Sequence, residues 1–170
     1  VLKSLNGGPQ KVGGIFNCQE CIKLTTLEGA PQECKAFWCN ECFALTTLEG
    51  GPQKVDTFEC IKCRSLTTLE GAPQECNYFD CSKCNNLTTL EGAPQELQVF
   101  SCLSCNSLTS LLNGPKVVEQ TFDCSGCKKI DSLEGMPKVT GSIFCKNLAV
   151  KFKIDDVKKY NPVYRKIIAG

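Results

Sequence analysis

Hydrophobic and polar positions along this chain follow one pattern that returns every 21 or 22 residues. A unit has the form V-x-x-F-x-C-x-x-C-x-x-L-T-T-L-E-G-A-P. Because alternate residues of a strand point to opposite faces, the F-x-C segment predicts a short strand with Phe58 and Cys60 inward. Thr57, Glu59 and Ile61 then point outward. The phenylalanines that recur at this interval are Phe16, Phe37, Phe58, Phe79, Phe100, Phe122 and Phe144.

The repeat predicts a solenoid over residues 1–148, with residues 149–170 as a C-terminal cap or tail. One unit cannot bury its own apolar face, so neighbouring units must stack around a continuous core. Each unit is expected to add one strand to a parallel sheet, and the E-G-x-P segment to make a turn. About seven units are expected, the first entered mid-repeat at "LKSLNGGP". That start predicts a coil edge that upstream residues or another subunit would cover.

The unit resembles the leucine-rich repeat family, whose frame is L-x-x-L-x-L-x-x-N/C-x-L. In this chain, Phe stands at one Leu position of the frame, and the first Cys of each pair stands at another. The second Cys stands at the N/C position, with one extra residue before the next Leu. The "LTTLEGAPQ" copies look like the short leucine-rich repeats of bacterial effectors and of bacterial and phage proteins. The resemblance implies an α/β repeat fold, with a parallel sheet on the concave face and turns or short 3-10 segments on the convex face. It also implies a role in binding other proteins.

Twelve of the fifteen cysteines occur in six C-x-x-C pairs, for which three interpretations are open. The C-x2-C-x17-C-x2-C run that begins at Cys39 has the spacing typical of a thiolate zinc site. Disulfides between coils meet the Cα distance requirement, but side chains in register point the same way. Reduced structural thiols are favoured, because Cys34 and Cys76 share one repeat position with Val and Leu. No metal and no cofactor are therefore expected.

The paired cysteines and the phenylalanines form the predicted core. The first Cys of each pair replaces an inward Leu, and the second is expected to donate a weak hydrogen bond to a carbonyl of a neighbouring loop. The predicted core residues are Phe16, Cys18, Cys21, Phe37, Cys39, Cys42, Phe58, Cys60, Cys63, Phe79, Cys81, Cys84, Phe100, Cys102, Cys105, Phe122, Cys124 and Cys127.

Composition excludes several classes of function. The net charge is +1 and there is no histidine, so neither a nucleic-acid-binding face nor a catalytic triad is expected, and the chain is not predicted to be an enzyme. No run of about 18 apolar residues suggests a membrane span, and no secretory signal is visible. Free thiols favour the cytoplasm, or a particle assembled there such as a virion.

Variable outward positions are where a repeat scaffold is expected to bind. The predicted partner-binding residues are Trp38, Glu59, Ile61, Tyr78, Asp80, Val99 and Leu103. Aromatic side chains of this kind are common at the centres of protein interfaces. The sequence therefore predicts a non-catalytic scaffold for a protein partner. The alternatives are a structural or decoration subunit of a phage virion or other large assembly, and a zinc-binding protein.

The end of the chain departs from the repeat. Cys145 follows Phe144 directly, which predicts an outward thiol unless the register slips there. Asp155 or Asp156 is expected to cap a short helix through Tyr160, which Asn161-Pro162 would end. We expect this segment to cover the last coil. Partner contacts are predicted through Tyr164, Ile167 and Ile168.

Overall fold

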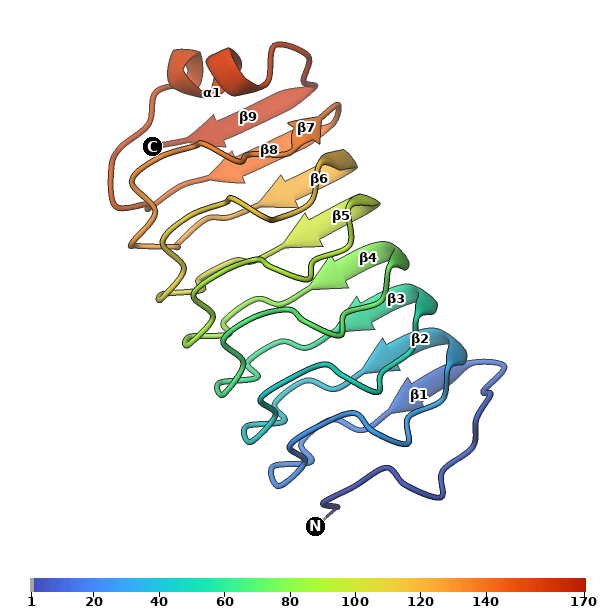
Figure 1. Ribbon diagram of the computed structural model, residues 1–170. Helices are drawn as coiled ribbons and strands as arrows, with labels where there is room; N and C mark the ends of the chain where they lie inside the picture. The colour runs from blue at the N-terminus through green and yellow to red at the C-terminus, as the bar shows by residue number, and fades with distance from the viewer. Residues whose placement is uncertain (1) are drawn as a thin grey trace.

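The computed structural model describes residues 2–170 as a stack of coils that form one parallel β-solenoid (Figure 1). The strands are β1 (Ile15–Asn17), β2 (Glu33–Trp38), β3 (Lys54–Glu59), β4 (Glu75–Asp80), β5 (Glu96–Ser101), β6 (Val117–Asp123), β7 (Lys138–Val139), β8 (Ser142–Cys145) and β9 (Lys166–Ala169). Their order in the sheet is β1-β2-β3-β4-β5-β6-β8-β9, with β7 paired to β6. The predicted solenoid with a parallel sheet is confirmed.

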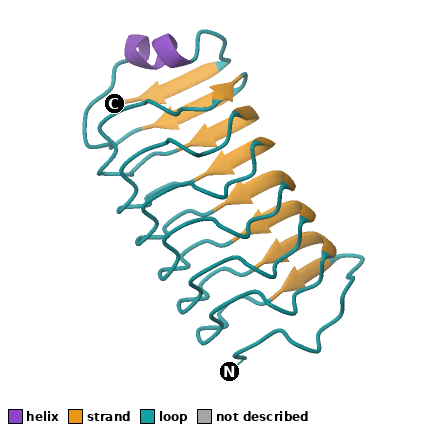
Figure 2. Cartoon of the chain, viewed as in Figure 1, coloured by secondary structure: helices purple, strands orange, loops and turns teal. Residues whose placement is uncertain are grey.

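The strands lie along one side of the stack, and loops make the rest of each coil (Figure 2). Between the strands, residues 18–137 form turns and irregular backbone without a helix or 3-10 segment. The one helix of the described chain, α1 (Ile154–Tyr160), lies outside the repeats. The return side is therefore built from turns, and the 3-10 segments that the family resemblance implied are not found among residues 2–170.

A file of stacked phenylalanine rings runs through the core beneath the sheet. Phe37, Phe58 and Phe79 are in register across neighbouring strands, and all three are fully buried. From Phe16 to Phe122, successive ring centroids lie 5.2–6.1 Å apart, and the rings are tilted by only 5–22°. Offset stacking of this kind adds to the apolar burial. The same side chain in the same place of each coil thus gives one continuous core.

Tight approach between coils explains the glycine of the E-G-x-P turn. Gly92 has φ +89°, a conformation that side chains with a Cβ rarely adopt. A Cβ built there would lie 2.5 Å from the backbone nitrogen of Glu70 and 2.5 Å from the carbonyl oxygen of Leu69. Both atoms belong to the preceding coil, so a side chain at position 92 would collide with the backbone of that coil as it is placed here.

The register slips by one residue in the last repeat. Ile143 pairs with Phe122 and continues the phenylalanine file, whereas Phe144 pairs with Asp123 on the outer face. The placement of Phe144 in the inward column was therefore wrong. Cys145 consequently points inward and is 1% exposed. Of the two alternatives for this residue, an outward thiol or a slipped register, the structure has the slipped register. Ile143 lies 21 residues after Phe122, and this register buries both Ile143 and Cys145.

The C-terminal segment adds a strand as well as a helix. Strand β9 pairs with β8, with Ile167 opposite Ile143 and packed against the core. Ile167 is therefore part of the stack rather than free for a partner, while Ile168 lies on the outer face beside Phe144. Tyr164, the third predicted contact, also packs against the core in part.

Helix α1 begins earlier than predicted, with Lys153 as its N-cap in place of Asp155 or Asp156. The Asp156 carboxylate instead accepts a hydrogen bond from the Lys153 backbone N–H at 2.9 Å. Acidic side chains in the first turn of a helix interact favourably with its positive end. Asn161 ends the helix, as predicted, and its buried side chain accepts from the Val139 N–H at 2.6 Å.

Candidate functional site

The outer face of the sheet brings most of the predicted partner-binding residues together. Trp38, Glu59 and Asp80 occupy one column of paired positions, and Tyr78 and Val99 are neighbours in a second. Ile61 and Leu103 follow the inward cysteines of their coils at the next outward position. All of these side chains except Asp80 are partly exposed. We refer to Trp38, Glu59, Ile61, Tyr78, Val99 and Leu103 as the outer patch.

Asp80 supports this face from within. It is only 9% exposed, and its carboxylate accepts hydrogen bonds from the Ser82 backbone N–H at 2.8 Å and from the Tyr78 hydroxyl at 3.4 Å. Burial, together with the charges of Asp80 and Glu59, raises the pKa of Tyr78 to about 12. Tyr78 therefore stays a neutral hydroxyl and donates to Asp80. The side chain of Asp80 is thus occupied within the fold.

Asn40 fixes the carboxylate of the outer patch, a role that the sequence pattern did not reveal. Its amide group donates to the Glu59 carboxylate at 2.9 Å, and its side-chain oxygen accepts from the Ile61 backbone N–H at 2.7 Å. These bonds join two neighbouring coils. They hold Glu59 and Ile61 in place, so part of the face is ordered before any partner binds.

The indole of Trp38 has an incomplete set of contacts. Its ring is partly exposed, yet the Nε1–H is buried and has no hydrogen-bond acceptor among residues 2–170. Buried indole N–H groups usually find a partner, and one without a partner costs about 1–3 kcal/mol. The N–H points into the fold, so what Trp38 offers on the outer patch is the exposed part of its ring.

The paired cysteines form a ladder of thiol hydrogen bonds between coils. The thiols of Cys42 and Cys63 donate to the carbonyl oxygens of Cys18 and Cys39 in the preceding coils, at 3.2 and 3.1 Å. The second cysteines of the following pairs repeat this contact at 3.1–3.2 Å. The hydrogen bond expected from the sequence for the second Cys of each pair is therefore present in five of the six pairs, the exception being Cys21 of the first coil.

Burial makes first cysteines of the pairs such as Cys39 and Cys124 poor nucleophiles. It raises the pKa of Cys39 and of Cys124 well above the ordinary value for a thiol. All fifteen cysteines are free thiols, and each is buried except the half-buried Cys21 and Cys34. Between residues 2 and 170, no three metal-binding side chains gather closely enough to hold an ion. Of the predicted core residues, Phe16 and Cys21 are the least covered, because both belong to the first coil.

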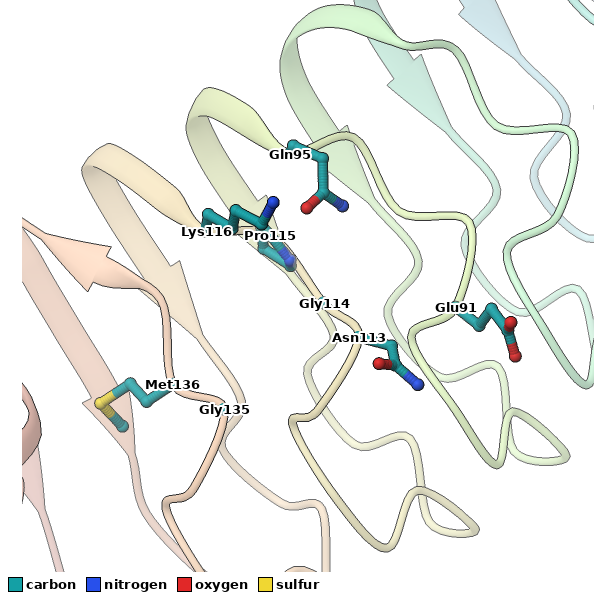
Figure 3. Close-up of a pocket in the computed structure, with 8 residues that line it drawn as sticks. All are labelled: Glu91, Gln95, Asn113, Gly114, Pro115, Lys116, Gly135 and Met136. Atoms are coloured by element: carbon teal, nitrogen blue, oxygen red, sulfur yellow. The ribbon is translucent and has the colours of Figure 1, made fainter.

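A shallow cavity of about 590 Å³ lies on the return side, where the repeat pattern is broken (Figure 3). Asn113 and Gly114 replace the usual Gly and Ala, and Met136 replaces an Ala one coil later. The labelled side chains are spread along the backbone and do not converge on one point (Figure 3). The cavity therefore has the shape of a gap between turns, without a group of side chains arranged for catalysis.

Comparison with known proteins gives no relative for this chain. Neither a family model nor a curated protein nor a solved structure matches it. Across residues 2–170, no helix is long and apolar enough to cross a membrane. The parallel β-solenoid is thus the class of fold that the geometry defines, and any function has to be argued from its surfaces.

The purified protein is expected to hold less than one zinc ion per chain, because every paired thiol except Cys21 is buried and the second thiol of the later five pairs is engaged with a carbonyl. Anaerobic denaturation should release fifteen free thiols, and a charged alkylating reagent should modify only Cys21 and Cys34 of the native protein. Elemental analysis and thiol titration measure both. About two or three zinc ions per chain, or unfolding by a chelator, would contradict the expectation.

Proposed function

We propose that the chain is a non-catalytic scaffold of leucine-rich repeat type that binds a protein partner through the outer patch. The observation that carries this proposal is the composition of the outer patch: the aromatic side chains of Trp38 and Tyr78 are partly exposed on the outer face, together with the partly exposed aliphatic side chains of Ile61, Val99 and Leu103. Tryptophan and tyrosine are enriched among the residues that dominate binding energy at interfaces. The sheet carries both on its outer face, Trp38 on β2 and Tyr78 on β4, where Tyr78 is paired with Val99 of β5.

The surroundings of Trp38 support a partner with basic groups at its rim. Glu59 is held by Asn40, and Asp123 and Asp80 lie further along the same column. Apolar side chains such as Ile61 and Val99 flank this column and offer contact area that desolvates on binding. An acidic column between apolar flanks favours a partner that places a basic group opposite Glu59.

The substitution Trp38→Ala is expected to weaken partner binding by about 2 kcal/mol or more, roughly 30-fold, and to leave the melting temperature nearly unchanged. The indole lies on the outer face, so its removal opens no cavity in the phenylalanine file. Binders can be selected from a display library of fragments encoded by the source genome, and their affinities for both forms measured by interferometry.

Ile15→Ala provides a matched control, because Ile15 is also an exposed apolar residue of the outer face but lies outside the patch. Its substitution should leave the affinity unchanged. If Trp38→Ala binds every partner as the wild type does, the recognition proposal fails.

A second candidate function is assembly through the N-terminal coil. Strand β1 forms one edge of the sheet, and the exposed apolar residues Leu2, Ile15 and Ile22 gather on this coil. An open strand edge is a template for pairing with another chain. If association persists in Trp38→Ala but is abolished by a polar capping coil fused before Leu2, the chain is better described as an assembly subunit.

A further inference from the structure

The C-x-x-C turns of three successive coils form a groove of about 270 Å³, next to the Ile61 and Leu103 end of the outer patch. Its lining residues are Lys62, Arg64, Lys83, Asn85, Ser104 and Asn106. Each of these side chains is a cation, an amide or a hydroxyl, and none is a carboxylate. The net charge of the whole chain is only +1, so this local concentration of cations is not visible in the composition.

Two of the three cations in the groove are uncompensated. Lys62 forms an ion pair with Glu41 at 2.6 Å. Arg64 lies with its guanidinium carbon 4.9 Å from the centre of the Phe43 ring, a stacking contact that orients the guanidinium group. Neither Arg64 nor Lys83 has an acidic partner in the described chain. Both therefore remain available to an anion.

The polar neutral residues add directed hydrogen-bond donors. The Asn106 amide group donates to the side-chain oxygen of Asn85 at 3.1 Å, which links the two amides across neighbouring coils. The amide N–H groups of Asn85 have no acceptor within residues 2–170. The groove thus combines fixed amide donors with mobile cationic ones.

The backbone at this turn is the same in successive coils. Lys62, Lys83 and Ser104 share one repeat position with Glu20 and Glu41, and all five have a left-handed conformation, with φ of 57–63°. Gly126 occupies the same position in the next coil and adopts this conformation without the steric cost that a Cβ brings. The left-handed turn is therefore a feature of the repeat, and the groove is distinguished by the side chains at and beside this position.

The geometry points to a binding site for the tetrahedral oxyanion of a phosphorylated ligand. Lysine and arginine form short charge-assisted hydrogen bonds to phosphate oxygens, and amide and hydroxyl groups complete the shell. Pockets for drug-sized molecules usually exceed about 300 Å³, so a groove of this volume suits one phosphoryl group and the atoms that carry it. This inference does not depend on the outer patch.

The decisive variant is Lys83→Gly. Glycine suits the left-handed conformation, so the melting temperature should equal or exceed that of the wild type. Loss of the ammonium group should weaken binding of phosphate by at least about tenfold. Inorganic phosphate and glycerol phosphate serve as probes in amide chemical-shift titrations at constant ionic strength. Tighter binding of the ester would assign the ligand as a phosphate monoester, and equal binding would assign free phosphate; both support the site.

Two control variants separate the groove from general charge effects. Glu20→Gly makes the same backbone change at the same repeat position but outside the groove, and Lys35→Gln removes one exposed cation elsewhere. Both should bind phosphate at least as well as the wild type, and so should Trp38→Ala. The inference is overturned if Lys83→Gly binds as the wild type does, if wild type shows no saturable binding, or if acetate and chloride give the same shifts.

Discussion

Replacing Phe79 with alanine is expected to lower the free energy of unfolding by about 3–5 kcal/mol, because a fully buried ring is lost and a cavity remains. The ring stacks on Phe58 at 5.3 Å and on Phe100 at 5.7 Å, so its removal interrupts the file in the middle of the solenoid. Neighbouring coils cannot close the gap without breaking the in-register strand pairing on either side. A urea titration followed by circular dichroism measures the loss.

Phe16→Ala is the matched control for this prediction. Phe16 stands at the end of the same file, stacks on one neighbour, and is only partly buried. Because less apolar area is covered there, the loss should be clearly smaller than at Phe79. Equal losses at the two positions would mean that the stacked file does not form the core as described.

Replacing Gly92 with alanine is expected to cost about 3 kcal/mol or more, although it adds only one methyl group. Two effects act together at this turn. The left-handed φ of +89° is unfavourable for alanine, and the new Cβ would lie 2.5 Å from backbone atoms of Glu70 and Leu69. Backbone atoms cannot rotate away as a side chain can, so the coils must separate.

Gly126→Ala distinguishes these two effects. Gly126 also has a left-handed conformation, with φ +76°, but a Cβ there would meet the Ser104 hydroxyl oxygen at 2.6 Å, which can rotate. Its loss should therefore be limited to the conformational term of about 1–2 kcal/mol. If both substitutions reduce the melting temperature equally, close approach of the coils is not what requires glycine at position 92.

The columns of the repeat were predictable because each coil places the same residue type in the same environment. Phenylalanine at a fixed interval, followed by an inward cysteine two residues later, indicates strand alternation in every unit, and errors in one unit are corrected by its neighbours. This is why the parallel solenoid and the inward direction of Phe58 and Cys60 followed from the pattern. The family resemblance supports only a proposal about function, because no family model, curated protein or solved structure matches the chain.

The repeat pattern could not predict the structure at positions that differ between coils. Sequence spacing suggested that Phe144 would point inward, but burial of Ile143 and Cys145 together determines the register of β8. Likewise, residues 166–169 looked like part of a cap, and only pairing with β8 makes them a strand. Such choices depend on which alternative packing buries more apolar surface, and no single residue reveals that.

The repeat in the sequence thus determines the coil, its core and the direction of each side chain, because all of these depend on contacts that recur at one interval. The surfaces are decided only in the folded stack, where residues about one coil apart become neighbours. Lys62, Lys83 and Arg64 line one groove for this reason, although the chain is nearly neutral. Asp80, by contrast, is engaged by Ser82 and Tyr78 of its own coil, and the Trp38 N–H has no acceptor among residues 2–170. Neither feature follows from the repeat, because the side chains at these positions differ from coil to coil.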